Sequence, residues 1–154
     1  MKWFYEPFKH DLHKQKGEDK MNKLKWWFRI VGGFYLLLGV PNVYFSLFNP
    51  QALSATYGTI TDELAIRVIA DTNLIVGLGM AVLGVMMFIA AREPGRAIFF
   101  GLAIAMLELF QWVPYNVVAL LHRTLFSSVE IPFLILHLIF GITGIAFLRQ
   151  TKAE

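Results

Sequence analysis

Four long apolar stretches constrain the fold of this chain more than any other feature of its sequence. Each is about 20 residues or longer with few charges, the length that an α-helix needs to cross the hydrocarbon core of a bilayer. A β-strand interpretation fails because the stretches are too long and do not alternate between apolar and polar residues. They cover residues 27–48, 64–91, 97–121 and 129–148.

The composition supports a membrane protein. Of 154 residues, 56% are hydrophobic and only 16% are charged, whereas soluble domains carry about 25% charged residues. This balance excludes a disordered chain and a basic nucleic-acid-binding domain. The sequence has no cysteine, which excludes disulfides, thiolate chemistry and cysteine-ligated metal centres.

Short polar links separate the apolar stretches and predict antiparallel neighbours. The link Arg92-Glu93-Pro94-Gly95-Arg96 is a turn signal because Pro and Gly both interrupt helices. We therefore predict an all-α membrane protein, a four-transmembrane-helix up-down bundle with an N-terminal amphipathic or interfacial arm. The arm covers residues 1–26, the transmembrane domain 27–149 and a cytoplasmic tail 150–154.

The distribution of basic residues predicts the orientation. Residues 1–29 hold eight of the 14 Lys and Arg residues. The 92–96 turn and the C-terminal end place four more on the same side, which leaves two on the other. By the positive-inside rule we expect a multi-pass protein of the inner (plasma) membrane with both termini cytoplasmic. No signal peptide is expected, since the first 25 residues are polar and charged.

Aromatic residues accompany the charges of the arm. Trp3, Phe4, Tyr5 and Phe8 lie among lysines, a mixture that favours a helix lying in the membrane interface or docked on a partner. A solvated tail is the alternative. The Trp26-Trp27 pair is expected in the aromatic belt at the cytoplasmic interface.

Polar residues inside the predicted spans are candidate functional residues, because an ionisable group in a bilayer is costly unless it has a partner. Counted along the helices, nearly all of them fall in the outer half, with Glu108 near mid-membrane and His137 about two turns from the outer end. Arg67 and Asp71 lie four residues apart, where they could pair. The pattern predicts a polar funnel open to the outer face. The candidate catalytic residues are Glu108 and His137, and the candidate ligand-binding residues are Asn42, Arg67, Asp71, Asn73, Gln111, Trp112 and Asn116.

Two explanations of Glu108 and His137 stay open. A buried carboxyl beside an imidazole could serve acid–base chemistry or a quinone site, with Trp112 and Tyr115 as flat walls. A structural hydrogen-bonded pair between the third and fourth helices explains the same residues, and we favour it. No HExxH or ExxH spacing is present, so we predict no metal site. Two histidines at matched depth, as a haem would need, are also missing.

Glycines concentrate in the inner halves of the helices, where they would permit close backbone approach. We therefore expect the inner half to be a tightly packed plug, which argues against a transport path through the chain. The glycines concerned are Gly32, Gly33 and Gly39 in the first stretch, Gly77, Gly79 and Gly84 in the second, and Gly141 and Gly144 in the fourth.

The sequence resembles the small bacterial four-helix membrane proteins of the DoxX-like group. The resemblance covers residues 27–149. It rests on the first stretch ending Leu38-Gly39-Val40-Pro41-Asn42, on Arg67 and Asp71 at the entry to the second, and on Glu108 inside the third. It implies an association with membrane oxidoreductases.

These observations lead to two functional hypotheses. The first is an accessory subunit of a larger inner-membrane complex, oxidoreductase-associated, that stabilises helices or a lipid- or quinone-filled cleft. The alternative is a membrane enzyme or a protein that binds a quinone or another small apolar ligand in the outward-facing polar site. The expected partners are the lipid bilayer and other membrane subunits, and no nucleic acid. No cofactor is predicted, with a quinone or a metal ion as the alternatives.

Overall fold

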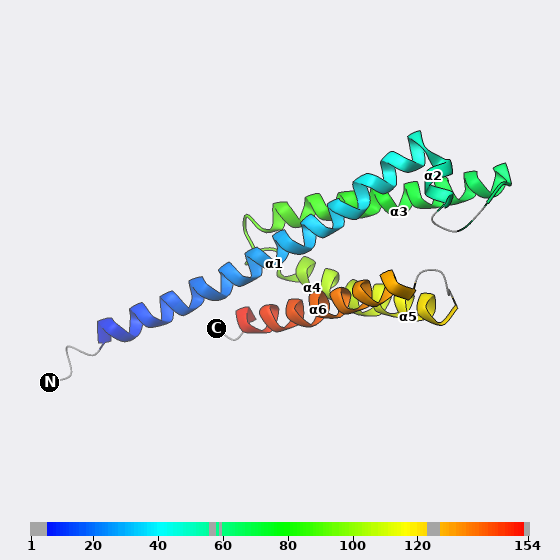
Figure 1. The fold of residues 1–154 in the computed structure, drawn as a ribbon. Coiled ribbons are helices and arrows are strands. Elements are labelled where there is room, and N and C mark those ends of the chain that lie inside the picture. The colour runs from blue at the N-terminus through cyan, green and yellow to red at the C-terminus, as the bar shows by residue number, and fades with distance from the viewer. Residues whose placement is uncertain (1–5, 56–57, 59, 123–126, 153–154) are drawn as a thin grey trace. The chain divides into compact units, whose positions relative to one another are not determined.

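A computed structural model describes residues 6–55, 58, 60–122 and 127–152, and it is helical through almost all of them (Figure 1). Side chains are described for residues 17–55, 58, 60–121 and 130–151. The elements in chain order are α1 (Glu6–Phe48), α2 (Pro50–Ala55), α3 (Glu63–Ala90), α4 (Ile98–Leu107), the π-helical turn η1 (Glu108–Trp112), α5 (Val113–His122) and α6 (Ser127–Lys152).

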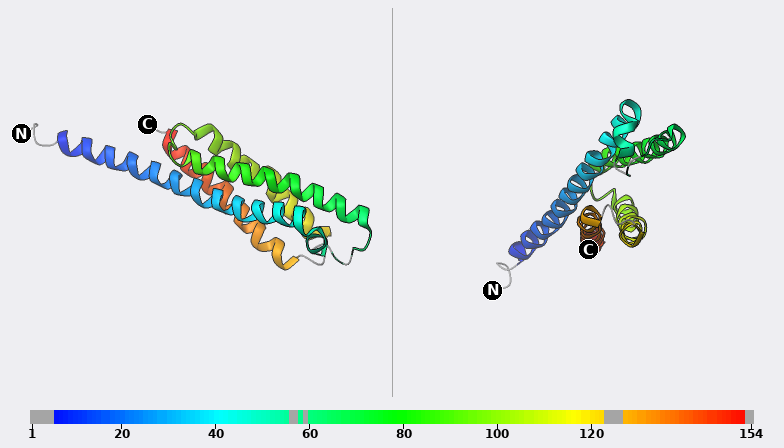
Figure 2. Two further views of the ribbon diagram at one scale, coloured as in Figure 1. Left: turned by 90° about the horizontal axis from the view of Figure 1, so that it is seen from above. Right: turned by 45° about the vertical axis from the view of Figure 1, so that its right-hand side comes forward.

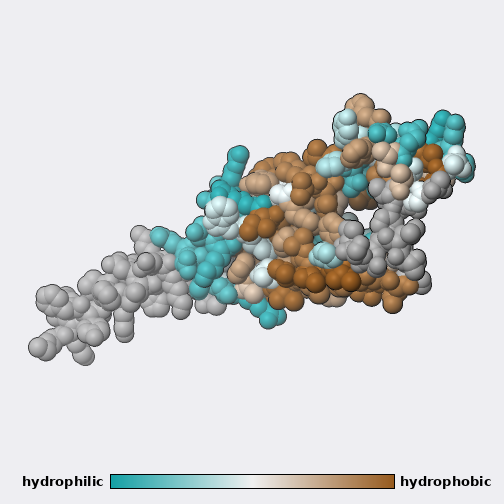
Figure 3. All heavy atoms as spheres, viewed as in Figure 1, coloured by the Kyte–Doolittle hydropathy of each residue, from teal (hydrophilic) through white to brown (hydrophobic). Residues whose placement is uncertain are grey.

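Four helical segments are long and apolar enough to cross a bilayer, which confirms the all-α class and the four predicted spans. They are Gly17–Phe48, Glu63–Ala90, Ile98–Leu121 and Glu130–Thr151. Large apolar side chains on their outer faces, such as Leu37, Phe99 and Leu121, are 70–80% exposed. In Figure 3 hydrophobic residues cover the helices, and hydrophilic ones gather near helix ends. The chain is therefore a multi-pass membrane protein.

Helix α1 continues well beyond the predicted first span. It runs without a break from Glu6 to Phe48, so no helix end separates the arm from the span at residues 26 and 27 (Figures 1 and 2). Trp3, Phe4 and Tyr5 lie outside the described residues, and the side chain of Phe8 is not described. The expected attachment of these aromatics to the membrane surface stays a prediction.

The chain divides into two compact units, one made of residues 29–89 and the other of the residues on either side. In the 29–89 unit, α1 and α3 pack antiparallel at reciprocal glycine contacts. A Cβ added at Gly39 would lie 2.7 Å from the carbonyl oxygen of Gly77, and one at Gly84 would lie 2.9 Å from that of Gly32. The predicted close packing of these four glycines is confirmed. Gly33 and Gly79 differ, since a Cβ at either would meet nothing within 4 Å.

The other unit packs the α4–η1–α5 segment against α6, and the stretch of α1 that ends at Phe28 joins it. The ring of Phe28 stacks on Phe100 with centroids 6.3 Å apart. Trp27 is 4% exposed and donates its indole N–H to the carbonyl oxygen of Phe140 over 3.1 Å. The expectation that Trp27 belongs to an interfacial belt is therefore wrong, whereas Trp26 is 53% exposed.

Glycines also bring α6 close to its neighbours. A Cβ at Gly144 would lie 2.5 Å from the ring of Trp27 and 3.0 Å from Ala105, and one at Gly141 would collide with Leu109. These contacts confirm the two α6 glycines as packing positions.

Two of the predicted links between the spans differ in structure. The 92–96 segment is a turn, where Arg96 pairs with Glu93 over 2.7 Å. The segment after the first span is more ordered than expected, since it contains α2. Asn49 precedes that helix, and its side-chain oxygen accepts the N–H of Ala52 over 3.1 Å, which caps the helix.

Candidate functional site

The site centres on a buried carboxyl–imidazole pair. Glu108 lies at the start of η1 and His137 lies in α6, with side chains 0% and 3% exposed. Nδ1 of His137 is hydrogen-bonded to Oε2 of Glu108, so one proton is held between these two atoms. The structure confirms the predicted bond between the third and fourth spans.

The second carboxyl oxygen of Glu108 is unsatisfied in the part of the chain that the structure describes. Oε1 is buried, and no described group hydrogen-bonds to it. A buried polar atom without a partner costs about 1–3 kcal/mol, so such atoms are few in native proteins and each calls for an explanation. The only other described side chain with such an atom is Ser46, in the 29–89 unit.

Aromatic rings surround the imidazole of His137. The Trp112 ring stacks on it with centroids 5.5 Å apart and planes 12° apart, and the Phe133 ring does so at 6.3 Å and 25°. Tyr115 meets Trp112 edge-on at 6.1 Å. Trp112 thus provides a flat apolar surface against the imidazole, as the sequence predicted, whereas the role of Tyr115 as a second wall stays a prediction.

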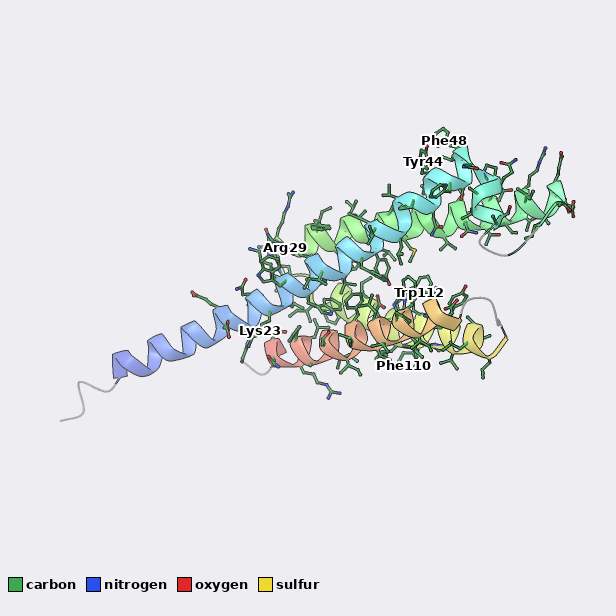
Figure 4. The ribbon with its side chains drawn as sticks, in the orientation of Figure 1. Lys23, Arg29, Tyr44, Phe48, Phe110 and Trp112 are labelled. Carbon is green, nitrogen blue, oxygen red and sulfur yellow. The ribbon has the colours of Figure 1, made fainter. Side chains whose placement is uncertain are left out.

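A widened helical turn positions these residues. In η1 the N–H of Val113 bonds to the carbonyl oxygen of Glu108, five residues back instead of four. Pro114 has no N–H to offer the carbonyl four residues before it, which weakens α-helical bonding at this point. Single π-helical turns inside α-helices are frequent at functional sites. Figure 4 shows Trp112 and Phe110 on different sides of this segment, and Phe110 is 70% exposed.

Two further predicted residues belong to this segment but have different roles. Asn116 is 3% exposed and donates its side-chain N–H to the carbonyl oxygen of Trp112 over 2.7 Å. It therefore fixes the backbone that carries the indole. Gln111 is exposed and, although it lies in η1, makes no hydrogen bond with Glu108 or His137.

The other four predicted ligand-binding residues belong to the 29–89 unit. Asn73 donates its side-chain N–H to the carbonyl oxygen of Ile69 over 2.8 Å, and Asn42 packs beside Gly77. Arg67 and Asp71 are both exposed. No ion pair joins these two described side chains, so the pairing expected from their spacing does not form. Their part in a ligand site stays a prediction.

The contact between Glu108 and His137 is the one that the sequence predicted between the third and fourth spans. The depth of the two residues in the membrane stays a prediction.

Phe133 and the unsatisfied oxygen of Glu108 were not predicted from the sequence. Phe133 lies four residues before His137, a spacing that brings side chains together on a helix, so a signal was present. Nothing in the sequence indicates which oxygen of Glu108 is left without a partner, because that depends on the packing of two helices.

The side chains that could bind a metal ion do not form a metal centre in the part of the chain that the structure describes. No group of three His, Asp or Glu side chains gathers there. Comparison with known proteins adds no candidate: no family model matches the sequence, and no curated protein or solved structure is significantly similar to it.

Proposed function

We propose that the protein binds a small apolar ligand within the membrane, at a polar site built on Glu108 and His137. The observation that carries the proposal is the unsatisfied Oε1 of a fully buried glutamate. A pair needed only for packing has no reason to leave an acceptor without a donor. Replacing buried polar pairs by apolar residues of similar volume is often neutral or stabilising, so stability alone does not account for this one.

The surroundings of the pair support the same proposal. Trp112 is half-buried, and its ring stacks on the imidazole of His137. The π-helical turn holds Glu108 and Trp112 within one widened turn of backbone. Small-molecule sites in proteins combine mostly apolar and aromatic walls with a few placed polar groups, and this arrangement has both.

An accessory subunit of a larger membrane complex, oxidoreductase-associated, is the second candidate. The continuation of α1 favours it, because the helix begins at Glu6, about 27 Å at 1.5 Å per residue before the buried Leu24. A polar helix alone in water is marginally stable, so a partner or the membrane surface would be expected to support this segment.

Native mass spectrometry of the full chain, extracted from its own membranes with the surrounding lipid, tests both candidates. We expect a monomer or small homo-oligomer that carries a bound small molecule. Glu108→Met, which removes both carboxyl oxygens and keeps the side-chain length, should lose that molecule. Ser46→Ala is the matched control, because it removes the other unsatisfied buried atom and should retain the molecule.

Each other outcome is decisive. Recovery of the protein with partner chains at a fixed ratio and no small molecule would overturn ligand binding and support the accessory subunit. Recovery without any bound molecule or partner would overturn both. A molecule that survives Glu108→Met in a folded protein would place the site elsewhere.

A further inference from the structure

The hydrogen bond between Glu108 and His137 limits what the partner of Oε1 can be. One proton lies between Nδ1 of His137 and Oε2 of Glu108. With the proton on the nitrogen, Glu108 is a carboxylate and both of its oxygens are acceptors. With the proton on Oε2, Oε1 is the carbonyl oxygen of a carboxylic acid and is again an acceptor. In both arrangements Oε1 accepts a hydrogen bond, so a donor satisfies it. A second proton, carried by Oε1 while Nδ1–H donates to Oε2, would make Oε1 a donor instead, and an acceptor-only ligand would then satisfy it.

The position of Glu108 in the membrane and the aromatic rings near it limit the chemical class of the donor further. Glu108 lies inside the Ile98–Leu121 candidate span, where an additional charge would be costly, which favours a neutral group. The rings of Trp112 and Phe133 stack on the imidazole that binds Glu108, and Tyr115 meets Trp112 edge-on. Another aromatic ring packs favourably against a cluster of this kind.

From these constraints we infer that the ligand is a neutral aromatic alcohol, of the phenol or quinol class, whose hydroxyl donates a hydrogen bond to Oε1 of Glu108. This inference rests on the proposed function and specifies its ligand. An aromatic ketone, quinone or ether of the same shape presents only acceptors, so it leaves Oε1 unsatisfied when the shared proton is the only one that the carboxyl holds. Because Oε1 is buried, the hydroxyl reaches it only after a neighbouring side chain moves.

Matched probes test the inference in the full chain reconstituted into phosphatidylcholine nanodiscs. The probes are radiolabelled para-octylphenol, para-octylanisole, in which a methyl group replaces the hydroxyl hydrogen, and para-octylbenzaldehyde, which has an acceptor only. Retention by empty nanodiscs is subtracted. We expect para-octylphenol to bind about tenfold more tightly than the other two, the size of one buried hydrogen bond.

Two variants test whether Glu108 causes the tighter binding of para-octylphenol. Glu108→Met should remove the preference for the phenol, because no acceptor remains. Ser46→Ala should keep it, because Ser46 belongs to the 29–89 unit. If Glu108→Met does not fold, nitrogen NMR of histidine-labelled wild-type protein replaces it. The His137 signal, assigned by its absence in His137→Asn, should shift with para-octylphenol and not with para-octylanisole.

The outcomes separate the two proposals. Equal or tighter saturable binding of the anisole or the aldehyde would overturn the ligand class and leave ligand binding at this site standing. Protein-dependent binding of none of the probes would also overturn the phenol class. Ligand binding itself would then be judged by the native mass spectrum. A phenol preference that persists in folded Glu108→Met would show that another residue supplies the acceptor.

Discussion

At the scale of single residues, Glu108 and His137 depend on each other. Each is buried, and each has the other as a hydrogen-bond partner. Removing one partner of a buried ionisable pair leaves a polar group that neither water nor protein satisfies, which is far more costly than removing both. The energetic value of the pair is therefore a coupling between two positions and cannot be assigned to either one.

A double-mutant cycle should reveal this coupling. We expect His137→Leu alone to lower the free energy of unfolding by about 3–5 kcal/mol, because Glu108 loses its partner. Combining it with Glu108→Met should restore most of the loss, because two apolar side chains can fill the same space. Denaturant unfolding in detergent micelles measures all three variants. A double variant as unstable as the sum of the single ones would contradict a coupled pair.

The sequence indicates this pair but not the place of every side chain around it. Glu108 and His137 are ionisable residues in apolar stretches, so they stand out in any hydropathy profile. Trp27 is a side chain whose placement the sequence does not predict. Two adjacent tryptophans at the start of a span fit an interfacial belt, yet neighbouring helical residues point about 100° apart, as the helical repeat requires. Trp26 is exposed and Trp27 is buried against Phe140, which only the packing of α1 decides.

At the scale of elements, reciprocal glycine contacts determine how closely α1 and α3 pack. Gly32 and Gly39 are seven residues apart, as are Gly77 and Gly84, so both contacts lie on one face of each helix. Because lipid gives no hydrophobic drive for helices to associate, close backbone packing of this kind stabilises the hairpin. Sequence analysis predicted glycine packing but could not separate these four from Gly33 and Gly79.

Alanine substitutions should separate the two kinds of glycine. In Gly39→Ala the new Cβ would meet the carbonyl oxygen of Gly77 at 2.7 Å, so α1 and α3 must move apart. We expect a loss of about 1–3 kcal/mol in the free energy of unfolding, as for other overpacked sites. The matched control Gly33→Ala meets nothing within 4 Å, and it should be neutral or gain up to about 1 kcal/mol from helix propensity.

Denaturant unfolding of the two variants in the same detergent provides the comparison. Equal effects of Gly39→Ala and Gly33→Ala would show that the close approach of α1 to α3 is not maintained in the membrane protein. Gly77→Ala and Gly79→Ala give a second matched pair on α3, with the Cβ at Gly77 2.9 Å from that of Asn42 and the Cβ at Gly79 in open space.

At the scale of the whole molecule, hydropathy alone predicted the four spans, because the length and polarity of the bilayer dictate them. The sequence predicted an interfacial helix in the arm as an element separate from the first span. In the structure the two form one continuous helix, Glu6–Phe48. The π-helical turn was also missed, because Pro114 indicates a local disturbance without specifying its form.

The orientation in the membrane is directly testable, because the chain has no native cysteine. A single cysteine at Asp62, before α3, should react with a membrane-impermeant maleimide applied to intact cells. A single cysteine at Gly95, in the turn before α4, should react only after the membrane is opened. The charge asymmetry predicts this pattern, with both termini cytoplasmic. The reverse pattern would overturn the predicted orientation.

The hydrogen bond of Glu108 to His137 also bears on how the protein enters the membrane during synthesis. The two residues are 29 positions apart, whereas Trp27 and Phe140 are separated by 113. A segment inserted alone would bring an unpaired glutamate or histidine into lipid at a cost of several kcal/mol. If α4–η1–α5 and α6 leave the translocon together as a hairpin, Glu108 and His137 enter the lipid already hydrogen-bonded to each other. We therefore expect the C-terminal hairpin to be the unit of insertion, which waits for its second helix before it is released laterally into lipid.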